Sequence, residues 1–239
     1  MTALVSKTNH GDPAENYRLL RDFSLREGAA VFGVAATEPE RDDFPDLSPE
    51  TRLSLSRAGV AGIPLARGVL DDIQNQPTRL YLHHYRQVNW QLDRLALEIA
   101  RWIEKRGGKA APIAASQIVD WNGQKGHLSH REMGRRAGLG WIGRNNLLIT
   151  PAYGSALRLV TVLCDLPLAA DRPLNRDCGD CFRCLAACPA GAIGNDPSEF
   201  NFNKCYEQLK IFKNSLGLGQ YICGLCVKLC PASAPPNTV

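Results

Sequence analysis

The spacing of apolar positions in the first half of the chain predicts helices and short buried strands. Residues 14–27 carry apolar side chains three residues apart, which favours a helix with one buried side. A continuous apolar run over residues 28–37 predicts a short buried strand. Residues 84–108 repeat apolar side chains every three or four positions and predict the longest helix. Residues 38–82 are rich in Pro, Asp and Arg without a clear period, so we expect loops with short helices there.

Further along, the pattern predicts one more strand, a capped helix and a pair of strands. Residues 110–120 read as a strand. The S-x-x-E sequence at 129–132 is a capping box, so a helix should begin there and stop at Gly138. Residues 146–150 and 156–164 are apolar and flank a short segment with Pro, Tyr and Gly. This arrangement predicts two strands joined by a tight connection.

A G-x-G-x-x-G sequence follows the capped helix, with its glycines at Gly138, Gly140 and Gly143. This spacing is the fingerprint of dinucleotide-binding sites, which need a strand before the glycines and a helix after them. Here the order is reversed, and the acidic residue about 20 positions further on, at the end of a second parallel strand, is missing. We therefore expect a helix stop and a turn rather than NAD binding. Arg144 and the two asparagines that follow it would also suit the binding of a polar ligand, and the sequence leaves this alternative open.

Composition limits the classes of partner. Hydrophobic residues make up 44% of the 239 residues, which is enough for a packed core. The net charge is +4, from 28 basic and 24 acidic side chains, and the basic residues form no block. This charge does not favour nucleic acid or a membrane surface as a partner.

The ends and the linker of the chain predict its location and its domains. The N-terminal residues lack the apolar region of a signal peptide, and no apolar run approaches the roughly 18 residues of a spanning helix. We therefore expect a cytoplasmic protein without a membrane partner. Residues 165–177 contain two prolines and no period, so we place a domain boundary near Asp171. It separates an α/β domain at residues 1–170 from a smaller domain at residues 171–239.

Eight of the nine cysteines lie after residue 177, which in a reducing compartment indicates metal ligands rather than disulfides. The first run, at residues 178–189, has the spacing C-x2-C-x2-C-x3-C-P of bacterial ferredoxins. In that pattern three cysteines bind one 4Fe–4S cluster and the fourth binds the other. A second run at residues 223–231 repeats C-x2-C-x3-C-P, and Cys205 stands between the two runs.

Eight thiolates supply two 4Fe–4S clusters with four ligands each. The ligands assigned to the first cluster are Cys178, Cys181, Cys184 and Cys230. The ligands assigned to the second cluster are Cys188, Cys205, Cys223 and Cys226. The alternative is zinc, because paired C-x2-C sequences also build zinc ribbons, although a ribbon needs only four thiolates. The ninth cysteine, Cys164, falls in an apolar run and is expected to be a buried core residue.

Three segments together resemble the epoxyqueuosine reductase family: HREMGRRAGLGWIGRNNLLITPAYGS at residues 130–155, DLPL at residues 165–168, and the two cysteine runs. The resemblance covers about residues 115–235 well and the earlier part loosely. Members of this family carry two 4Fe–4S clusters and a cobalamin, and are related to reductive dehalogenases. The resemblance therefore implies an N-terminal α/β domain that cradles the corrinoid and a ferredoxin-like domain that passes electrons to cobalt.

The resemblance also implies roles for particular residues. The glycine turn would line the corrinoid pocket, and its candidate residues are Gly140, Trp141, Gly143, Arg144 and Asn145. A family carboxylate shortly before the capped helix acts as general acid, and the matching position is Asp120. Longer members continue into a helical region that helps to hold tRNA. This chain stops at Val239 and has no basic patch, which makes tRNA a doubtful substrate.

We therefore expect an α+β protein in which an N-terminal α/β domain precedes a two-cluster bacterial ferredoxin-like domain. The predicted function is that of an iron–sulfur oxidoreductase, which receives electrons from a redox donor protein. Its two 4Fe–4S clusters would pass them to a bound corrinoid or a small-molecule substrate. The alternative is an electron-transfer or corrinoid-activating partner protein without a substrate of its own. A closed pocket containing Asp120 and Arg144 would favour the enzyme, and an exposed flat surface near Cys230 would favour the partner protein.

Overall fold

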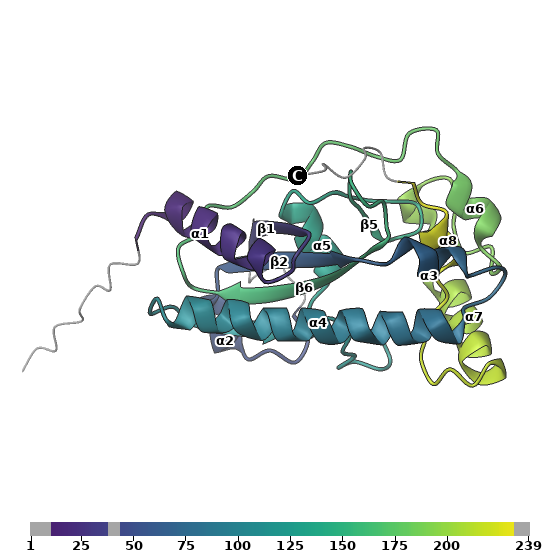
Figure 1. The fold of residues 1–239 in the computed structure, drawn as a ribbon, viewed down its shortest axis with the longest axis horizontal. Coiled ribbons are helices and arrows are strands. Elements are labelled where there is room, and N and C mark those ends of the chain that lie inside the picture. Colours follow the sequence, from purple (N-terminus) through teal and green to yellow (C-terminus); the bar gives the residue numbers. More distant parts are fainter. Residues whose placement is uncertain (1–10, 38–43, 232–239) are drawn as a thin grey trace, which may run out of the picture.

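A four-stranded antiparallel sheet forms the centre of the protein, in a computed structural model that describes residues 11–37 and 44–231 (Figure 1). The strand order is β1–β2–β6–β3, and every neighbouring pair is antiparallel. The strands are β1 (Val31–Ala36), β2 (Arg57–Pro64), β3 (Ala110–Ile113) and β6 (Leu157–Cys164). A separate pair consists of β4 (Trp141–Ile142) and β5 (Leu148–Ile149).

Helices cover both faces of this sheet and gather at one of its ends. The N-terminal helices are α1 (Pro13–Arg26), α2 (Pro49–Ser54), α3 (Arg67–Asp71), α4 (Arg79–Glu104) and α5 (His130–Arg136). Helices α1 and α4 pack on one face, and α5 packs on the other. The C-terminal helices are α6 (Arg183–Ala187), a 3-10 turn (Pro197–Glu199), α7 (Phe202–Ser215) and α8 (Leu225–Lys228). Figure 1 shows these C-terminal helices grouped beyond one end of the sheet.

Alternate residues of β6 build the two halves of the core. Val160 and Val162 face the half that contains α4, and Leu159 and Leu163 face the half that contains α5. This alternation follows from the period of two in a strand. Cys164 is fully buried in the α4 half, which confirms its prediction as a core residue.

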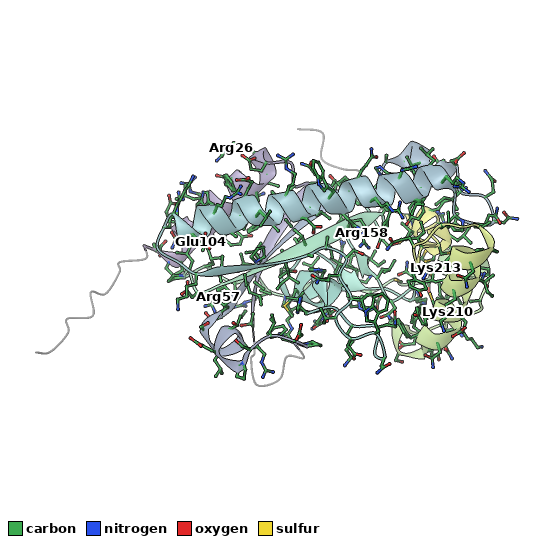
Figure 2. The ribbon with its side chains drawn as sticks, turned by 90° about the horizontal axis from the view of Figure 1, so that it is seen from below. Arg26, Arg57, Glu104, Arg158, Lys210 and Lys213 are labelled. Atoms are coloured by element: carbon green, nitrogen blue, oxygen red, sulfur yellow. The ribbon has the colours of Figure 1, made fainter. Side chains whose placement is uncertain are left out.

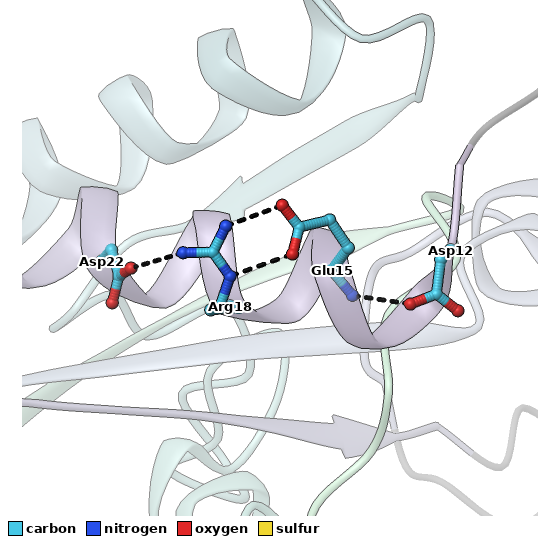
Figure 3. A network of polar contacts seen from close by, with 4 residues as sticks. All are labelled: Asp12, Glu15, Arg18 and Asp22. Carbon is cyan, nitrogen blue, oxygen red and sulfur yellow. Dashed lines mark hydrogen bonds and ion pairs between the residues drawn. The ribbon is translucent and has the colours of Figure 1, made fainter.

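Helix α1 shows how local sequence sets an element. The Asp12 carboxylate accepts the N–H of Glu15 at 3.0 Å and caps the helix (Figure 3). Arg18 then bridges Glu15 at 2.7 Å and Asp22 at 3.4 Å. These ion pairs are exposed and contribute little to stability, so the burial of Leu20 against the core holds the helix in place.

The C-terminal part of the chain shares an apolar core with the sheet and its covering helices, residues 11–37 and 44–170, which we call the sheet domain. Leu218, Ile222 and Leu225 belong to the same apolar cluster as Ile73 and Tyr81. The mixed helix-and-sheet class is confirmed, and no strand occurs between residues 171 and 231. The ferredoxin-like character of this part and the domain boundary near Asp171 stay predictions.

For residues 38–82 and for the strands within residues 146–164, the structure adds features that the sequence pattern did not predict. The stretch predicted as loops, residues 38–82, contains the internal strand β2, whose small residues Ala58, Gly59 and Ala61 give no alternation because both faces are covered. The two strands predicted within residues 146–150 and 156–164 are present as β5 and β6. They do not pair with each other, since β5 pairs with β4 and β6 lies between β2 and β3.

In the described residues, no helix has the length and apolar character that crossing a membrane would require. The expectation that the N-terminus lacks a signal peptide concerns mainly residues 1–10, which lie outside the described residues. Part of the predicted loop region, residues 38–43, lies outside them too.

Candidate functional site

The glycine turn ends α5 with two paired backbone hydrogen bonds. The N–H of Leu139 donates to the Gly134 carbonyl at 3.0 Å, and the N–H of Gly138 donates to the Arg135 carbonyl at 3.2 Å. These are the bonds of a Schellman motif, and Gly138 has the positive φ, 66°, that this motif requires. A helix therefore precedes the glycines, as predicted, and the segment lacks the strand–turn–helix order of a dinucleotide site.

The turn then packs against the first cysteine run. Trp141 of β4 pairs with Ile149 of β5. A Cβ atom on Gly140 would collide with the carbonyl of Ile149, and one on Gly143 would come within 3.2 Å of the Cys178 sulfur. Both positions therefore need glycine for close packing, and Gly143 places the turn beside a predicted cluster ligand.

The eight C-terminal cysteines are distributed over loops and short helices. Cys178 and Cys181 precede α6, Cys184 lies in α6 and Cys188 ends it. The remaining positions are Cys205 in α7, Cys223 before α8, Cys226 in α8 and Cys230 after it. Short helices therefore hold residues from both runs, which are distant in the sequence, at the same end of the molecule (Figure 1).

Four thiols influence one another electrostatically as one set. Burial raises the pKa of the Cys184 thiol, and the thiols of Cys230, Cys178 and Cys181 raise it further. Burial also raises the pKa of Cys230, with contributions from Cys178 and Cys181. These four residues are the ones assigned from the sequence to the first cluster.

The other four thiols form a second set. Burial raises the pKa of Cys223 to about 11, and the thiols of Cys205 and Cys188 add to the rise. Burial also raises the pKa of Cys226, followed by contributions from the other three thiols of this set and from Cys184. The influence of Cys184 on Cys226 shows that the two sets are neighbours.

The chemistry of both sets suits iron–sulfur clusters. Cysteine thiolates are the ligands of 4Fe–4S clusters, and N–H groups near the sulfurs tune them. The N–H of Ala192 approaches the Cys188 sulfur at 3.4 Å, and the backbone of Leu225 bonds to Cys223. Within residues 11–37 and 44–231, no group of three or more His, Cys, Asp or Glu side chains is arranged to hold a metal ion. The assignment of ligands to clusters accordingly remains a prediction.

Arg144 holds the first cysteine run in place. Its guanidinium donates to the carbonyls of Cys181 at 3.1 Å and Gly179 at 2.9 Å. It also lies over the ring of Phe182, with 4.2 Å to the centroid. A planar guanidinium suits this combination of stacking and several acceptors. The corrinoid contact implied for Arg144 stays a prediction, while its observed partners all belong to the C-terminal part.

Asn145 connects the turn to the last cysteine. Its side-chain amide donates to the Ser155 hydroxyl at 3.2 Å, and its side-chain oxygen accepts the N–H of Leu147 at 3.3 Å. Both the hydroxyl and the backbone of Ser155 bond to Cys230. Asn145 is buried, so this network fixes the position of the Cys230 sulfur from the side of the sheet domain.

Each set of thiols borders a cavity. A cavity of about 560 Å³ lies against the first set, and its lining residues include Trp141, Arg176, Cys178, Cys181 and Cys230. A cavity of about 280 Å³ lies against the second set, and its lining includes Tyr81, Tyr85, Arg158 and the four cysteines of that set. The second cavity is therefore lined both by cysteines and by polar residues of the sheet domain.

Asp120 lies in a tight turn and not at the end of a strand. Strand β3 ends at Ile113, so the predicted strand over residues 110–120 is too long. Asp120 pairs with Lys125 in an isolated bridge, and its carboxylate accepts the N–H groups of Asn122 and Gly123, each at 3.0 Å. These local bonds form an Asx-type turn. Among the described residues, no hydrogen bond joins Asp120 to Arg144, whose guanidinium bonds to carbonyls of the first cysteine run.

His130 is a buried neutral base between the sheet and the loop after β3. Its Nε2–H donates to the Ala114 carbonyl at 2.9 Å, and Nδ1 therefore accepts the Thr161 hydroxyl proton at 2.8 Å. Burial lowers the pKa of His130 to about 4. Since both nitrogens are occupied, this residue positions the start of α5 rather than acting on a ligand.

The lowered pKa of His130 predicts that the protein loses stability as the pH falls. Between pH 6.5 and 4 the unfolded chain binds a proton that the folded chain does not bind, so the free energy of unfolding decreases as the pH falls through this range. The loss should reach about 1 kcal/mol at pH 5.5 and about 3 kcal/mol in total. Anaerobic urea unfolding at pH 7.5 and 5.5 measures it. His130→Gln should flatten this dependence, and His83→Gln, at an exposed position, should leave it unchanged.

Arg158 is a polar residue of this region that the sequence analysis missed. It lies on β6 beneath α4 (Figure 2), and it donates to the Tyr85 hydroxyl at 3.1 Å and to Asn89 at 3.0 Å. Its positive charge is the main influence that lowers the pKa of Tyr85 against the opposing effect of burial. A single arginine inside the apolar run 156–164 was the signal that could have identified it.

In comparisons with known proteins, the chain is similar in sequence to proteins named epoxyqueuosine reductase. No protein-family model matches it. An epoxyqueuosine reductase from Synechocystis sp. is 36% identical over 242 aligned residues, which cover 96% of this chain and 78% of the relative. An epoxyqueuosine reductase from Bacillus subtilis is 35% identical over 131 residues, 52% of this chain. These residues are 33% of that relative, so the chain spans about a third of its length.

Solved structures share the fold at low sequence identity. The catabolic reductive dehalogenase NpRdhA has a TM-score of 0.77 and 18% identity, with 99% of this chain and 34% of that chain covered. An epoxyqueuosine reductase solved with an epoxyqueuosine-modified tRNA-Tyr stem loop has a TM-score of 0.60 and 21% identity. The match covers 92% of this chain and 65% of that chain. At these identities the likeness concerns the fold.

Proposed function

Since the chain belongs to the epoxyqueuosine reductase family, we propose that it is a reductase that takes its electrons through two 4Fe–4S clusters. The observation that carries this proposal is the pair of neighbouring thiol sets, each with four half-buried cysteines. Clusters bound there would supply single electrons. The acceptor is a corrinoid, or a substrate that receives the electrons directly.

The proximity of the sets supports electron transfer from one cluster to the other. Cys184 of the first set and Cys226 of the second influence one another, and both lie in short helices that contact each other, α6 and α8. Arg144 and Ser155 restrain the first set from the side of the sheet domain. These contacts would keep the ligands in position when the charge of a cluster changes.

The cavity beside the second set supports reduction at the boundary with the sheet domain. Arg158 and Tyr85 line it together with Cys223 and Cys226, so a positive charge and a hydroxyl proton lie next to the proposed electron source. A bound acceptor that gains electrons gains negative charge, which the guanidinium would stabilise. We propose Asp120 as the proton donor, on the family resemblance.

The proposals for the corrinoid and for the substrate rest on the family resemblance. The residues of the glycine turn that we propose to border the corrinoid are Gly140, Trp141, Gly143, Arg144 and Asn145. A solved relative was crystallised with an epoxyqueuosine-modified tRNA stem loop, so this tRNA is the first substrate to test. The sequence of this chain contains no block of basic residues, which made tRNA a doubtful substrate in the sequence analysis.

A titration with cob(II)alamin tests the corrinoid. The chain, reconstituted to about eight iron atoms, is titrated anaerobically and followed by electron paramagnetic resonance. A corrinoid pocket should convert the cobalt signal to the base-off form, whereas cob(II)alamin in buffer alone keeps its base-on signal. An unchanged signal with full iron content would contradict the corrinoid and leave an electron carrier that reduces its partner directly.

A further inference from the structure

Trp141 has a buried hydrogen-bond donor without an acceptor. Its side chain is 7% exposed, and the indole Nε1 is buried and bonds to no atom of the described residues. An indole N–H can only donate, so no rotation of the ring turns it into an acceptor. Buried donors in folded proteins almost always have partners, and an exception calls for an acceptor that the protein chain does not itself supply.

Three of the four cysteines of the first set line the cavity beside Trp141. Cys178, Cys181 and Cys230 line the same cavity as the indole ring. A second, independent contact gives the same placement, because a Cβ atom on Gly143, two residues after Trp141, would lie 3.2 Å from the Cys178 sulfur. The indole is therefore a neighbour of the sulfurs that would hold the first cluster.

Two other polar side chains of this cavity, Asp177 and Arg176, make contacts within the protein. Asp177 accepts the N–H of Gly179 at 2.7 Å. The Arg176 guanidinium lies over the Trp141 ring, 5.9 Å from its centroid. A ligand of this cavity that could accept a hydrogen bond from the indole N–H should be rich in acceptors and negatively charged, as the sulfides and thiolates of a 4Fe–4S cluster are.

We propose that the Trp141 indole donates a hydrogen bond to the first 4Fe–4S cluster, at a sulfide or a cysteine sulfur, and raises the reduction potential of that cluster. This inference rests on the proposed function, because it needs a cluster on the first thiol set. Reduction adds negative charge to the sulfurs, and a hydrogen bond to an anionic acceptor becomes stronger as that charge grows. The donor therefore stabilises the reduced cluster more than the oxidised one.

The replacement Trp141→Phe removes the N–H and keeps an aromatic ring in the cavity. In a redox titration followed by electron paramagnetic resonance, without cobalamin, the potential of the first cluster should become more negative. The potential of the second cluster should stay the same and serves as an internal control. Cys205→Ala and Cys230→Ala, which should each lose one cluster, show which signal belongs to which cluster. Trp90→Phe is the control, because Trp90 is 61% exposed, and it should shift neither potential.

The outcomes separate the inference from the proposed function. A wild-type chain that binds no clusters would overturn the proposed function. If both clusters form and Trp141→Phe changes neither potential, or shifts both equally, the hydrogen bond is absent and only this inference fails.

A measurement on the wild-type protein does not depend on how the variant folds. The chain has four tryptophans, so a sample with 15N-labelled indoles gives four N–H resonances at most. One of them should be strongly shifted or broadened by the paramagnetic cluster, and single replacements of the other three tryptophans should leave it in place. Four resonances at ordinary positions in the iron-loaded protein would overturn the proposal.

Discussion

Cys205→Ala is expected to leave about four of about eight iron atoms per chain and to remove the signal of one cluster only. Cys205 stands alone between the two cysteine runs, and its thiol is influenced by Cys188 and influences Cys223 and Cys226. Cys205 does not contribute to the raised pKa of Cys184 or to that of Cys230. Iron analysis and electron paramagnetic resonance of the anaerobically reconstituted variant measure the result.

Two further variants complete this experiment. Cys230→Ala should remove the other cluster and keep the one that Cys205→Ala loses. Cys164→Val replaces the ninth cysteine, which is fully buried in β6 among apolar side chains, and should keep both clusters. Loss of both clusters, or of neither, in Cys205→Ala would contradict the assignment of ligands.

Helices were predictable where one face of the sequence is apolar and the ends carry signals. The long helix α4 buries one stripe against the sheet, and α5 begins at the capping Ser129 and ends before Gly138 as expected. Strand β2 was not predictable from a period, because both of its faces are covered and Gly59 and Gly62 leave room for neighbours. Its strand character depends on partners that are distant in the sequence, β1 and β6.

The sequence supplies candidate ligands for the site, whereas the surroundings of these residues are seen only in the structure. The spacing of the cysteines predicts cluster ligands, since short intervals within each run fit a loop around a cluster. The neighbours of each thiol depend on the fold: Arg144 holds the first run through its carbonyls, and Ser155 bonds to Cys230. The unpaired indole of Trp141 is also visible only in the structure, since a sequence does not show which donors lack acceptors.

Asp120→Asn is expected to keep both clusters and to lower turnover by about 10²- to 10⁴-fold, the usual contribution of a positioned general acid. The asparagine keeps the Oδ1 atom that accepts the N–H groups of Asn122 and Gly123, so the turn retains its bonds. What the change removes is the ability of the side chain to carry and release a proton. Reduction of an epoxyqueuosine-modified tRNA stem loop with a chemical reductant measures turnover, and iron content verifies the clusters.

Asp196→Asn is the matched control for this experiment. Asp196 also caps its own turn, with its Oδ1 atom accepting the N–H of Ser198 at 2.8 Å, but it lies in the C-terminal part of the chain. The same chemical change there should leave turnover intact. Equal turnover in Asp120→Asn and the wild type would remove Asp120 from the mechanism. The cavity beside the second thiol set would then point to Tyr85, whose hydroxyl accepts a hydrogen bond from Arg158, as the next proton donor to replace.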